Sequence, residues 1–235
     1  MSIAEKLTTI AENEQKVFEA GKQAEHEEFW SNVLSNRQWQ YKFGGGAWND
    51  LTFRPPFDIV PTGVYGNHMF SLCDIKDLAG ILEECGVTLD ITPCTTRCDS
   101  MFHYATKLTR VPYLDFRQYT GTIAPLTNMF YNCTSLHTIE GLHFKDDGTT
   151  KTDHTTFQNC TSLENITIYG VIGSDFDIHY SPLTKESIES VVEALSDTAE
   201  GKGVSFNNAA FTAAFPTEDD LVDIYMRKMN WNIVY

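Results

Sequence analysis

The chain has 235 residues, of which 42% are hydrophobic and 12% aromatic, so it is long enough for one large domain and too apolar to be disordered. Its 17 Lys and Arg against 32 Asp and Glu give a formal net charge of −15, which argues against nucleic-acid and membrane partners because it repels phosphate backbones and anionic lipid. No run approaches the ~18 apolar residues of a membrane span, and the start lacks a basic segment followed by an apolar run, so neither membrane insertion nor a secretory signal is expected.

The N-terminal segment, residues 1–36, has the pattern of a long α-helix. Ser2 and Glu5 have the spacing of a capping box. Apolar residues then recur at heptad-like spacing, at Ile3, Leu7, Ile10, Val17 and Ala24. The helix could pack on its own domain or form a coiled coil between copies of the chain. We favour the coiled coil, because about 30 residues would span about 45 Å, which is long for a helix docked on a small domain.

Residues 37–56 read as a linker with one short strand. Trp39, Tyr41 and Phe43 alternate with polar residues, as in a strand. The three glycines at 44–46 lack a following Lys-Ser/Thr pair, so they predict a turn and not a phosphate-binding loop. Two consecutive prolines, at 55 and 56, mark a second break.

The strongest signal is an internal repeat within residues 57–180. Phe102, Phe130 and Phe157 are separated by 28 and 27 residues, and the following Leu and Ile or Val positions keep that period. A period of this size predicts stacked units whose equivalent side chains pack on one another. The predicted repeat core consists of Phe102, Leu108, Val111, Phe130, Cys133, Leu136, Ile139, Phe157, Cys160, Leu163 and Ile166. We therefore predict a β-rich repeat solenoid with short helices and turns.

Other columns of the repeat carry further expectations. Asn132 and Asn159 share one column and are expected to hydrogen-bond the backbone of the turns. A weaker unit begins at residue 69. The second halves of two units carry inserts, Arg117–Thr127 and Lys145–Thr155, where binding loops are expected.

The last segment, residues 181–235, is expected to be an α/β cap that covers the apolar end of the stack. Ile188, Val191, Val192 and Leu195 lie on one face of a predicted helix. A second helix is expected after Thr217, with Asp220 at the capping-box position, followed by a short strand around Trp231 and Ile233.

The repeat carries a family resemblance. The runs Asn132-Cys-Thr-Ser-Leu-His-Thr-Ile139 and Asn159-Cys-Thr-Ser-Leu-Glu-Asn-Ile166 resemble BspA-type (Treponema-type) leucine-rich repeats. The opening from Ile3 to Val17 and the ending Asn230-Trp-Asn-Ile233 are similar to a narrower group found in phages and prophages of gut Firmicutes. The resemblance implies a leucine-rich-repeat solenoid, a tail-associated virion protein made in the bacterial cytoplasm, and a trimer joined by the N-terminal helix.

No catalytic, cofactor or metal site is predicted. The six cysteines form no CxxC pair, so free thiols in a reducing cytosol are expected. Cys94 and Cys98 could supply two zinc ligands, but no second pair stands near them, and free thiols are the better interpretation. The acidic loops lack the ligand spacing of a calcium loop. No nucleophile motif occurs, and Cys133 and Cys160 recur with the repeat, which indicates a structural role.

Three hypotheses for function follow. The first is a phage tail-fibre or baseplate-associated protein that binds itself, other virion proteins, and a host-surface protein or glycan. Its candidate ligand surface comprises Tyr104, Tyr119, Tyr131 and Tyr169, because tyrosine is a common binding anchor. The second is a bacterial cell-surface adhesin of the BspA type. The third is an enzyme with an unrecognised site. We favour the first.

Overall fold

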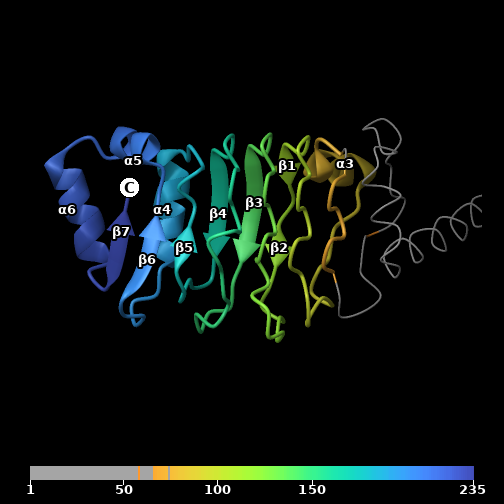
Figure 1. Cartoon of the computed structure of the whole chain (residues 1–235), viewed down its shortest axis with the longest axis horizontal. Coiled ribbons are helices and arrows are strands. Elements are labelled where there is room, and N and C mark those ends of the chain that lie inside the picture. The colour runs from red at the N-terminus through yellow and green to blue at the C-terminus, as the bar shows by residue number, and fades with distance from the viewer. Residues whose placement is uncertain (1–57, 59–65, 74) are drawn as a thin grey trace, which may run out of the picture.

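The protein is described by a computed structural model that covers residues 58, 66–73 and 75–235. The elements follow one another in chain order along the long axis of the molecule, from helix α3 (Leu78–Cys85) near one end to helix α6 (Glu218–Arg227) at the other (Figure 1). Chain order and spatial order agree because each unit pairs mainly with the units just before and after it.

The first sheet contains four parallel strands. Strands β1 (Arg110–Val111) and β2 (Leu114–Asp115) both pair with β3 (Thr138–His143), and β3 pairs with β4 (Asn165–Tyr169). Residue Val111 lies opposite Ile139, which lies opposite Ile166, so the register follows the 28- and 27-residue spacing of the sequence. Pro112 stands between β1 and β2, and since proline has no N–H it cannot donate to a strand ladder.

A helix lies at each edge of this sheet. Helix α3 is capped by Asp77, whose side chain accepts a hydrogen bond from the Gly80 amide, and Asp77 itself forms an isolated parallel bridge with Arg110. On the other side, helix α4 (Lys185–Ala194) contacts β4. The Ser187 and Ser190 hydroxyls of α4 accept hydrogen bonds from the amides of Ile166 and Ile168, at 3.0 and 2.9 Å. These hydroxyls satisfy strand amides that would otherwise need another strand.

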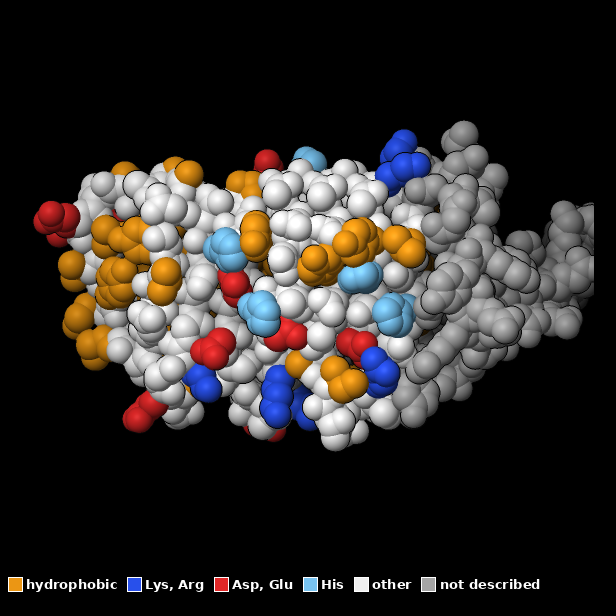
Figure 2. Space-filling view, in the orientation of Figure 1, with side chains coloured by type: hydrophobic (Ala, Val, Ile, Leu, Met, Phe, Trp, Pro, Cys, Tyr) orange, Lys and Arg blue, Asp and Glu red, His pale blue; other side chains and the backbone are white. Residues whose placement is uncertain are grey.

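The second sheet has three parallel strands in the order β5 (Phe176–Asp177), β6 (Lys202–Ser205) and β7 (Trp231–Val234). Helix α5 (Asn208–Ala214) follows β6, and α6 precedes β7 with the capping box that the sequence predicts at Thr217 and Asp220. Hydrophobic side chains gather on the surface at this end of the molecule, over α6 and β7 (Figure 2).

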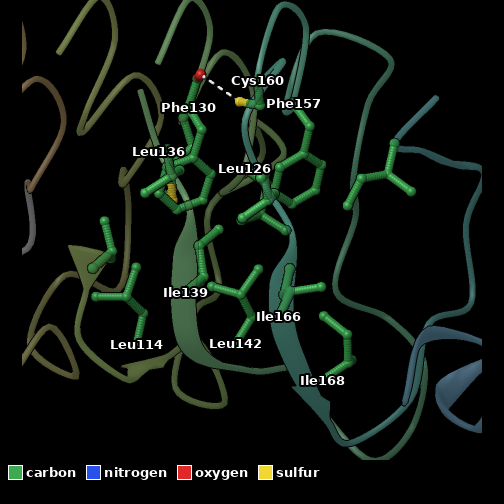
Figure 3. Close-up of a cluster of buried hydrophobic side chains, with 14 of the residues drawn as sticks. Leu114, Leu126, Phe130, Leu136, Ile139, Leu142, Phe157, Cys160, Ile166 and Ile168 are labelled. Carbon is green, nitrogen blue, oxygen red and sulfur yellow. Dashed lines mark hydrogen bonds between the residues drawn. The ribbon is translucent and has the colours of Figure 1, made fainter. Parts of the chain in front are cut away.

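The core is a continuous run of buried side chains that passes through both sheets. Its centre is a column of phenylalanine rings, Phe70, Phe102, Phe130 and Phe157, whose successive centroids lie 5.4, 5.4 and 5.6 Å apart in stacked geometry. Phe130 and Phe157 stand beside the buried aliphatic side chains of β3 and β4 (Figure 3). All eleven residues of the predicted repeat core are buried.

The turns between units place several residues in the left-handed region. Asn132 and Asn159 have φ of 60° and 64°, and the Asn159 amide donates to the Asn132 side-chain oxygen at 2.6 Å. The expected bond from these asparagines to the turn backbone is thus replaced, for this pair, by a bond between side chains. Tyr104 and Leu72 occupy the equivalent positions of earlier units, both with φ of 58°. Asparagine tolerates this conformation well, and bulky side chains adopt it at a cost.

The predicted fold class, a leucine-rich-repeat solenoid, is wrong. The described residues form four short helices and two small parallel sheets. A solenoid sheet needs a strand in every unit, but the amides of β4 bond to serine hydroxyls of α4 in place of the carbonyls of a further strand. Only the isolated bridge between Ile172 and Leu195 continues the pairing there. The helix predicted through Ile188, Val191 and Val192 is present as α4, but the repeat period did not show that its serines would end the first sheet.

The N-terminal predictions fall on residues that lie outside the described part. They comprise the long helix of residues 1–36, its proposed seam of Ile3, Leu7, Ile10, Val17 and Ala24, and the linker of residues 37–56. Within the described part, no helix has the length and apolar character to cross a membrane.

Candidate binding face on the first sheet

The outer face of the first sheet is lined by alternate side chains of its strands. Thr138, Glu140 and His143 of β3 are partly exposed, and Asn165, Thr167 and Tyr169 of β4 are exposed. The side chains that face the core are Ile139, Leu142, Ile166 and Ile168. Helix α3 lies at one side of this face and α4 at the other (Figure 1). The face is therefore a bounded surface on regular elements.

Two tyrosine rings dominate this face. Tyr113, between β1 and β2, and Tyr169, at the end of β4, are 39% and 45% exposed, and their ring centroids lie 5.7 Å apart at 62°. Gly141 of β3 lies between them, and a Cβ built there would be 2.8 Å from an atom of each ring. We call Tyr113, Gly141 and Tyr169 the tyrosine cleft. It depends on glycine, because any larger side chain would occupy the space between the rings.

His143 contacts both tyrosines of the cleft. The Tyr113 hydroxyl and the His143 Nδ1 form a short hydrogen bond, and the imidazole centroid lies 5.6 Å from that of Tyr169. Burial, and to a lesser degree the charge of Asp115, raise the pKa of Tyr113, although Arg117 opposes them. The Tyr113 hydroxyl therefore stays protonated at neutral pH and can donate a hydrogen bond to the imidazole of His143.

Ion pairs border the cleft. Arg117 contacts Asp115 at 2.6 Å, and Arg110 contacts Glu83 of α3 at 2.6 Å and also pairs with Glu140. Burial raises the pKa of Asp115, but the hydrogen bonds from Arg117 more than offset it, so this pKa lies below its ordinary value. The border is thus charged at neutral pH and holds both donors and acceptors.

Two hollows flank β3 and share Glu140. The one beside α3 has a volume of about 250 Å³ and a mostly apolar lining that includes Leu82, Val87, Pro112 and Tyr113. The one beside α4 has a volume of about 410 Å³ and is lined by hydroxyl, amide and carboxylate groups of Thr138, Glu140, Asn165, Thr167, Thr184, Glu186 and Ser187, together with Ile139 and Ile166. The face therefore changes from apolar to polar across the sheet.

The four tyrosines predicted as a ligand surface do not form one site. Tyr169 belongs to the tyrosine cleft. Tyr119 is only 6% exposed and donates its hydroxyl hydrogen bonds to the carbonyls of Thr96 and Ile123, at 2.9 and 2.6 Å. Burial, and then the nearby Cys98, raise the pKa of Tyr119 to about 12. The ligand-surface prediction for Tyr119 is therefore wrong, since its ring and hydroxyl hold the first insert in place.

Tyr104 and Tyr131 form a second aromatic cluster with His103. The His103 centroid lies 4.6 Å from that of Tyr104 and 5.3 Å from that of Tyr131. Burial, and then His68, lower the pKa of His103, so its ring is neutral at pH 7. On the face shown in Figure 2, histidine and hydrophobic side chains form a band along the described units, with acidic and basic groups below it.

The two inserts lie beside each other. Tyr119, Ile123 and Pro125 of the first, with Lys145, Thr149 and Lys151 of the second, line a hollow of about 180 Å³. Among the side-chain groups there, Thr120 donates to the Thr95 carbonyl and Thr149 to Asp147, so their hydroxyl hydrogens are already used within the chain. This hollow is therefore a weaker candidate than the sheet face.

The thiols are structural. Five of the six cysteines are buried and Cys85 is partly buried. The thiols of Cys133 and Cys160 donate to the carbonyls of Phe102 and Phe130, and that of Cys98 donates to the Cys94 carbonyl. In the part of the chain that the structure describes, no three His, Cys, Asp or Glu side chains gather where they could hold a metal ion.

The sequence interpretation missed Gly141 and gave His143 no role, although a signal was present. Tyr113 lies 28 residues before Gly141, and Tyr169 lies 28 after it, close to the repeat period. A lone glycine within a strand pattern indicates a close approach of another group. Together these signals predict two rings above and below a glycine in the stack.

Comparison with known proteins gives no relative. No protein-family model, no curated protein and no solved structure matches this chain.

Proposed function

We propose that this protein acts by binding rather than by catalysis, and that its ligand is a carbohydrate held at the outer face of the first sheet. The observation that carries the proposal is the tyrosine cleft, in which two half-exposed rings stand over Gly141. An aromatic ring offers an apolar face to the C–H groups of a sugar and keeps a hydroxyl in reach of its polar groups. Both rings are held before a ligand arrives, so little ordering entropy is lost on binding.

The surroundings of the cleft support a hydroxyl-rich ligand. The hollow beside α4 presents the hydroxyls of Thr138 and Thr167, the Asn165 amide and the carboxylates of Glu140 and Glu186. Carboxylates accept hydrogen bonds from sugar hydroxyls, and amides both donate and accept them. A peptide is the other ligand class, and the apolar hollow beside α3 would favour it.

The proposed setting is the tail of a phage virion, assembled in the bacterial cytoplasm, where the chain would bind a glycan of the host surface. The resemblance of the N- and C-terminal segments to phage and prophage proteins supports it. Self-association through the N-terminal segment, as a trimer, and contacts with other virion proteins belong to the same proposal. The alternative is an adhesin on a bacterial surface. Detection of the chain in purified virions by mass spectrometry supports the first, and its detection only on bacterial cells supports the second.

The binding proposal is tested on the full chain with an array of bacterial-surface oligosaccharides, followed by calorimetric titration of the best of them. Tyr113→Ala and Tyr169→Ala should each weaken binding about tenfold or more, since truncation of an aromatic anchor typically costs more than 1 kcal/mol. Tyr104→Ala is the matched control, because Tyr104 is 40% exposed but belongs to the other aromatic cluster.

Three results would contradict the proposal. Binding that is equally weakened by Tyr104→Ala would move the site away from the cleft. Binding of unglycosylated surface protein but of no oligosaccharide would replace the sugar with a peptide ligand. Release of new reducing ends from the bound oligosaccharide would show that the chain is an enzyme.

A further inference from the structure

The apolar hollow beside α3 adjoins the tyrosine cleft. The Tyr113 side chain belongs to the cleft and also lines this hollow, and Glu140 of β3 lines both this hollow and the polar one beside α4. A ligand that lies over the cleft therefore lies next to the hollow, which has a volume of about 250 Å³. The substituents of that ligand decide whether the hollow is filled or stays in water.

The walls of the hollow are apolar. They are formed by the side chains of Ala79, Leu82, Val87, Leu89, Pro112 and Tyr113. Leu82 and Leu89 are buried, and Val87 and Pro112 are partly exposed. An apolar group placed here leaves water, which is favourable, whereas an ammonium or hydroxyl group would lose water partners against these walls. The hollow therefore favours an apolar substituent of an otherwise polar ligand.

The polar side chains of the hollow leave one acceptor free. Both carboxylate oxygens of Glu83 accept hydrogen bonds from Arg110, at 2.9 and 2.6 Å, and the Thr88 hydroxyl donates to Asp58 at 3.0 Å. Glu140 accepts from Arg110 through Oε1, and no described residue donates to its Oε2. Because Arg110 holds Glu140 in place, this second oxygen is a fixed acceptor for a donor on the ligand.

An acetamido group combines the two features that the hollow calls for. Its methyl group is apolar, its N–H is a single donor, and its carbonyl can stay in water at the open side of the hollow. A free amino group would bring an ammonium ion against apolar walls. A hydroxyl group would reach the acceptor but would leave the apolar walls uncovered.

We propose that the ligand is an N-acetylated amino sugar, with its acetamido methyl in the hollow beside α3 and its N–H donating to Oε2 of Glu140. The inference rests on the proposed carbohydrate binding and names the class of sugar. It also gives the apolar hollow an occupant that belongs to a carbohydrate and not to a peptide.

The first test compares three tetramers with the same β-1,4-linked backbone, built from N-acetylglucosamine, glucosamine or glucose, by calorimetric titration of the full chain. The acetylated tetramer should bind about tenfold more tightly than the other two, since a single methyl group in an apolar pocket discriminates by at least about that factor. Any other acetamido sugar that binds on the array is compared in the same way with its chemically de-N-acetylated form.

The outcomes separate this inference from the proposed function. Equal binding of the acetylated and non-acetylated forms would overturn the inference and leave carbohydrate binding in place. So would array binders that all lack an acetamido group. Binding of no oligosaccharide at all would contradict the proposed function itself.

The second test locates the acetamido group and needs no substitution. In a saturation-transfer NMR experiment on the unchanged chain, the acetyl methyl protons should receive the strongest saturation of any ligand protons, because apolar side chains surround them. A methyl signal weaker than those of the sugar-ring protons would place the group outside the hollow and overturn the inference.

A substitution in the wall gives the third test. Val87→Asn makes the wall polar, so the affinities for the acetylated and glucose tetramers should come to within about twofold of each other. Val222→Asn is the matched control, because Val222 lies on α6 and lines neither hollow, and it should keep the preference. A circular-dichroism melting curve checks that both variants are folded. An unchanged preference in folded Val87→Asn would overturn the placement of the acetamido group.

Discussion

The thiol of Cys160 donates a hydrogen bond to the backbone carbonyl of Phe130, with 3.1 Å between the sulfur and the oxygen (Figure 3). Cys133 makes the same bond to Phe102, one unit earlier. Each small inward thiol thus satisfies a carbonyl of the preceding unit while the phenylalanine rings stack beside it. The phenylalanine column supplies apolar packing, and the cysteine column supplies buried donors for backbone carbonyls.

Removal of a ring from the centre of the phenylalanine column should be costly. Phe130 is fully buried and stacks on rings at both sides. Phe130→Ala should lower the free energy of unfolding by about 3–5 kcal/mol, because it loses burial and leaves a cavity. Urea denaturation followed by fluorescence measures this. Tyr169→Ala, on the surface, should lose less than about 1 kcal/mol. Equal losses for the two variants would contradict the role of the column.

The thiols should differ sharply in reactivity. Burial is the main cause that raises the pKa of Cys133 and Cys160, the latter to about 12. The pKa of Cys98 is raised by its interaction with the side chain of Cys94 and then by burial. Because the thiolate is the reactive form, a colorimetric thiol reagent at pH 8 should modify Cys85 alone in the native chain. All six should react in denaturant. Rapid modification of Cys133 or Cys160 in the native chain would show that the core opens readily.

Substitution of Leu72 by asparagine should stabilise the fold. It adopts φ of 58° and is 46% exposed. Its left-handed backbone is unfavourable for leucine, and the half-exposed side chain gains little burial to offset that cost. Leu72→Asn places there the residue type found at positions 132 and 159, and should raise the free energy of unfolding by about 1 kcal/mol. Asn132→Leu should have the opposite effect. A thermal melt of both variants tests the pair, and a destabilised Leu72→Asn would show that the leucine contacts matter more than the backbone.

Asp153 should contribute to acid sensitivity. Burial raises its pKa, but hydrogen bonds from Thr127 and Thr155 more than offset this, so its pKa in the folded chain lies below the usual 3.8. A lowered pKa stabilises the fold above pH 3.8, and that contribution is lost as the pH falls through the folded value. Asp153→Asn should therefore reduce the difference in unfolding free energy between pH 6 and pH 3. An unchanged difference would assign the acid response to other carboxylates.

Gly141 should be essential to the tyrosine cleft. Gly141→Ala places a Cβ 2.8 Å from atoms of Tyr113 and Tyr169, so one ring must move. We expect oligosaccharide binding to fall at least tenfold, because the arrangement of the two rings is lost. Stability should fall by about 1 kcal/mol or less, because the added Cβ meets half-exposed rings and not the buried core. Calorimetric titration and denaturation of the same sample separate the two effects. Gly203→Ala, where an added Cβ would meet no atom closer than 3.8 Å, serves as a control for binding. Full binding by Gly141→Ala would remove the cleft from the proposal.

The sequence by itself determined the buried columns of the repeat and the capped start of α6. The period of 28 and 27 residues brought the phenylalanine, leucine and isoleucine columns together, because equivalent positions of stacked units must face one another. The capping box at Thr217 and Asp220 is local, since three residues of separation suffice to form it. Such features depend on neighbours at fixed spacing along the chain.

Only the tertiary structure decided how the units end and what they expose. The first sheet stops at β4 because serine hydroxyls of α4 accept its amide hydrogens, a contact between residues more than 20 positions apart that no local pattern shows. Tyr119 is buried and Tyr113 exposed because the path of an insert sets their surroundings, and both residues have the same chemistry. Long-range hydrogen bonds and the direction of each side chain are set only when the units pack. The tyrosine cleft joins residues of three units, so only the packed structure shows it.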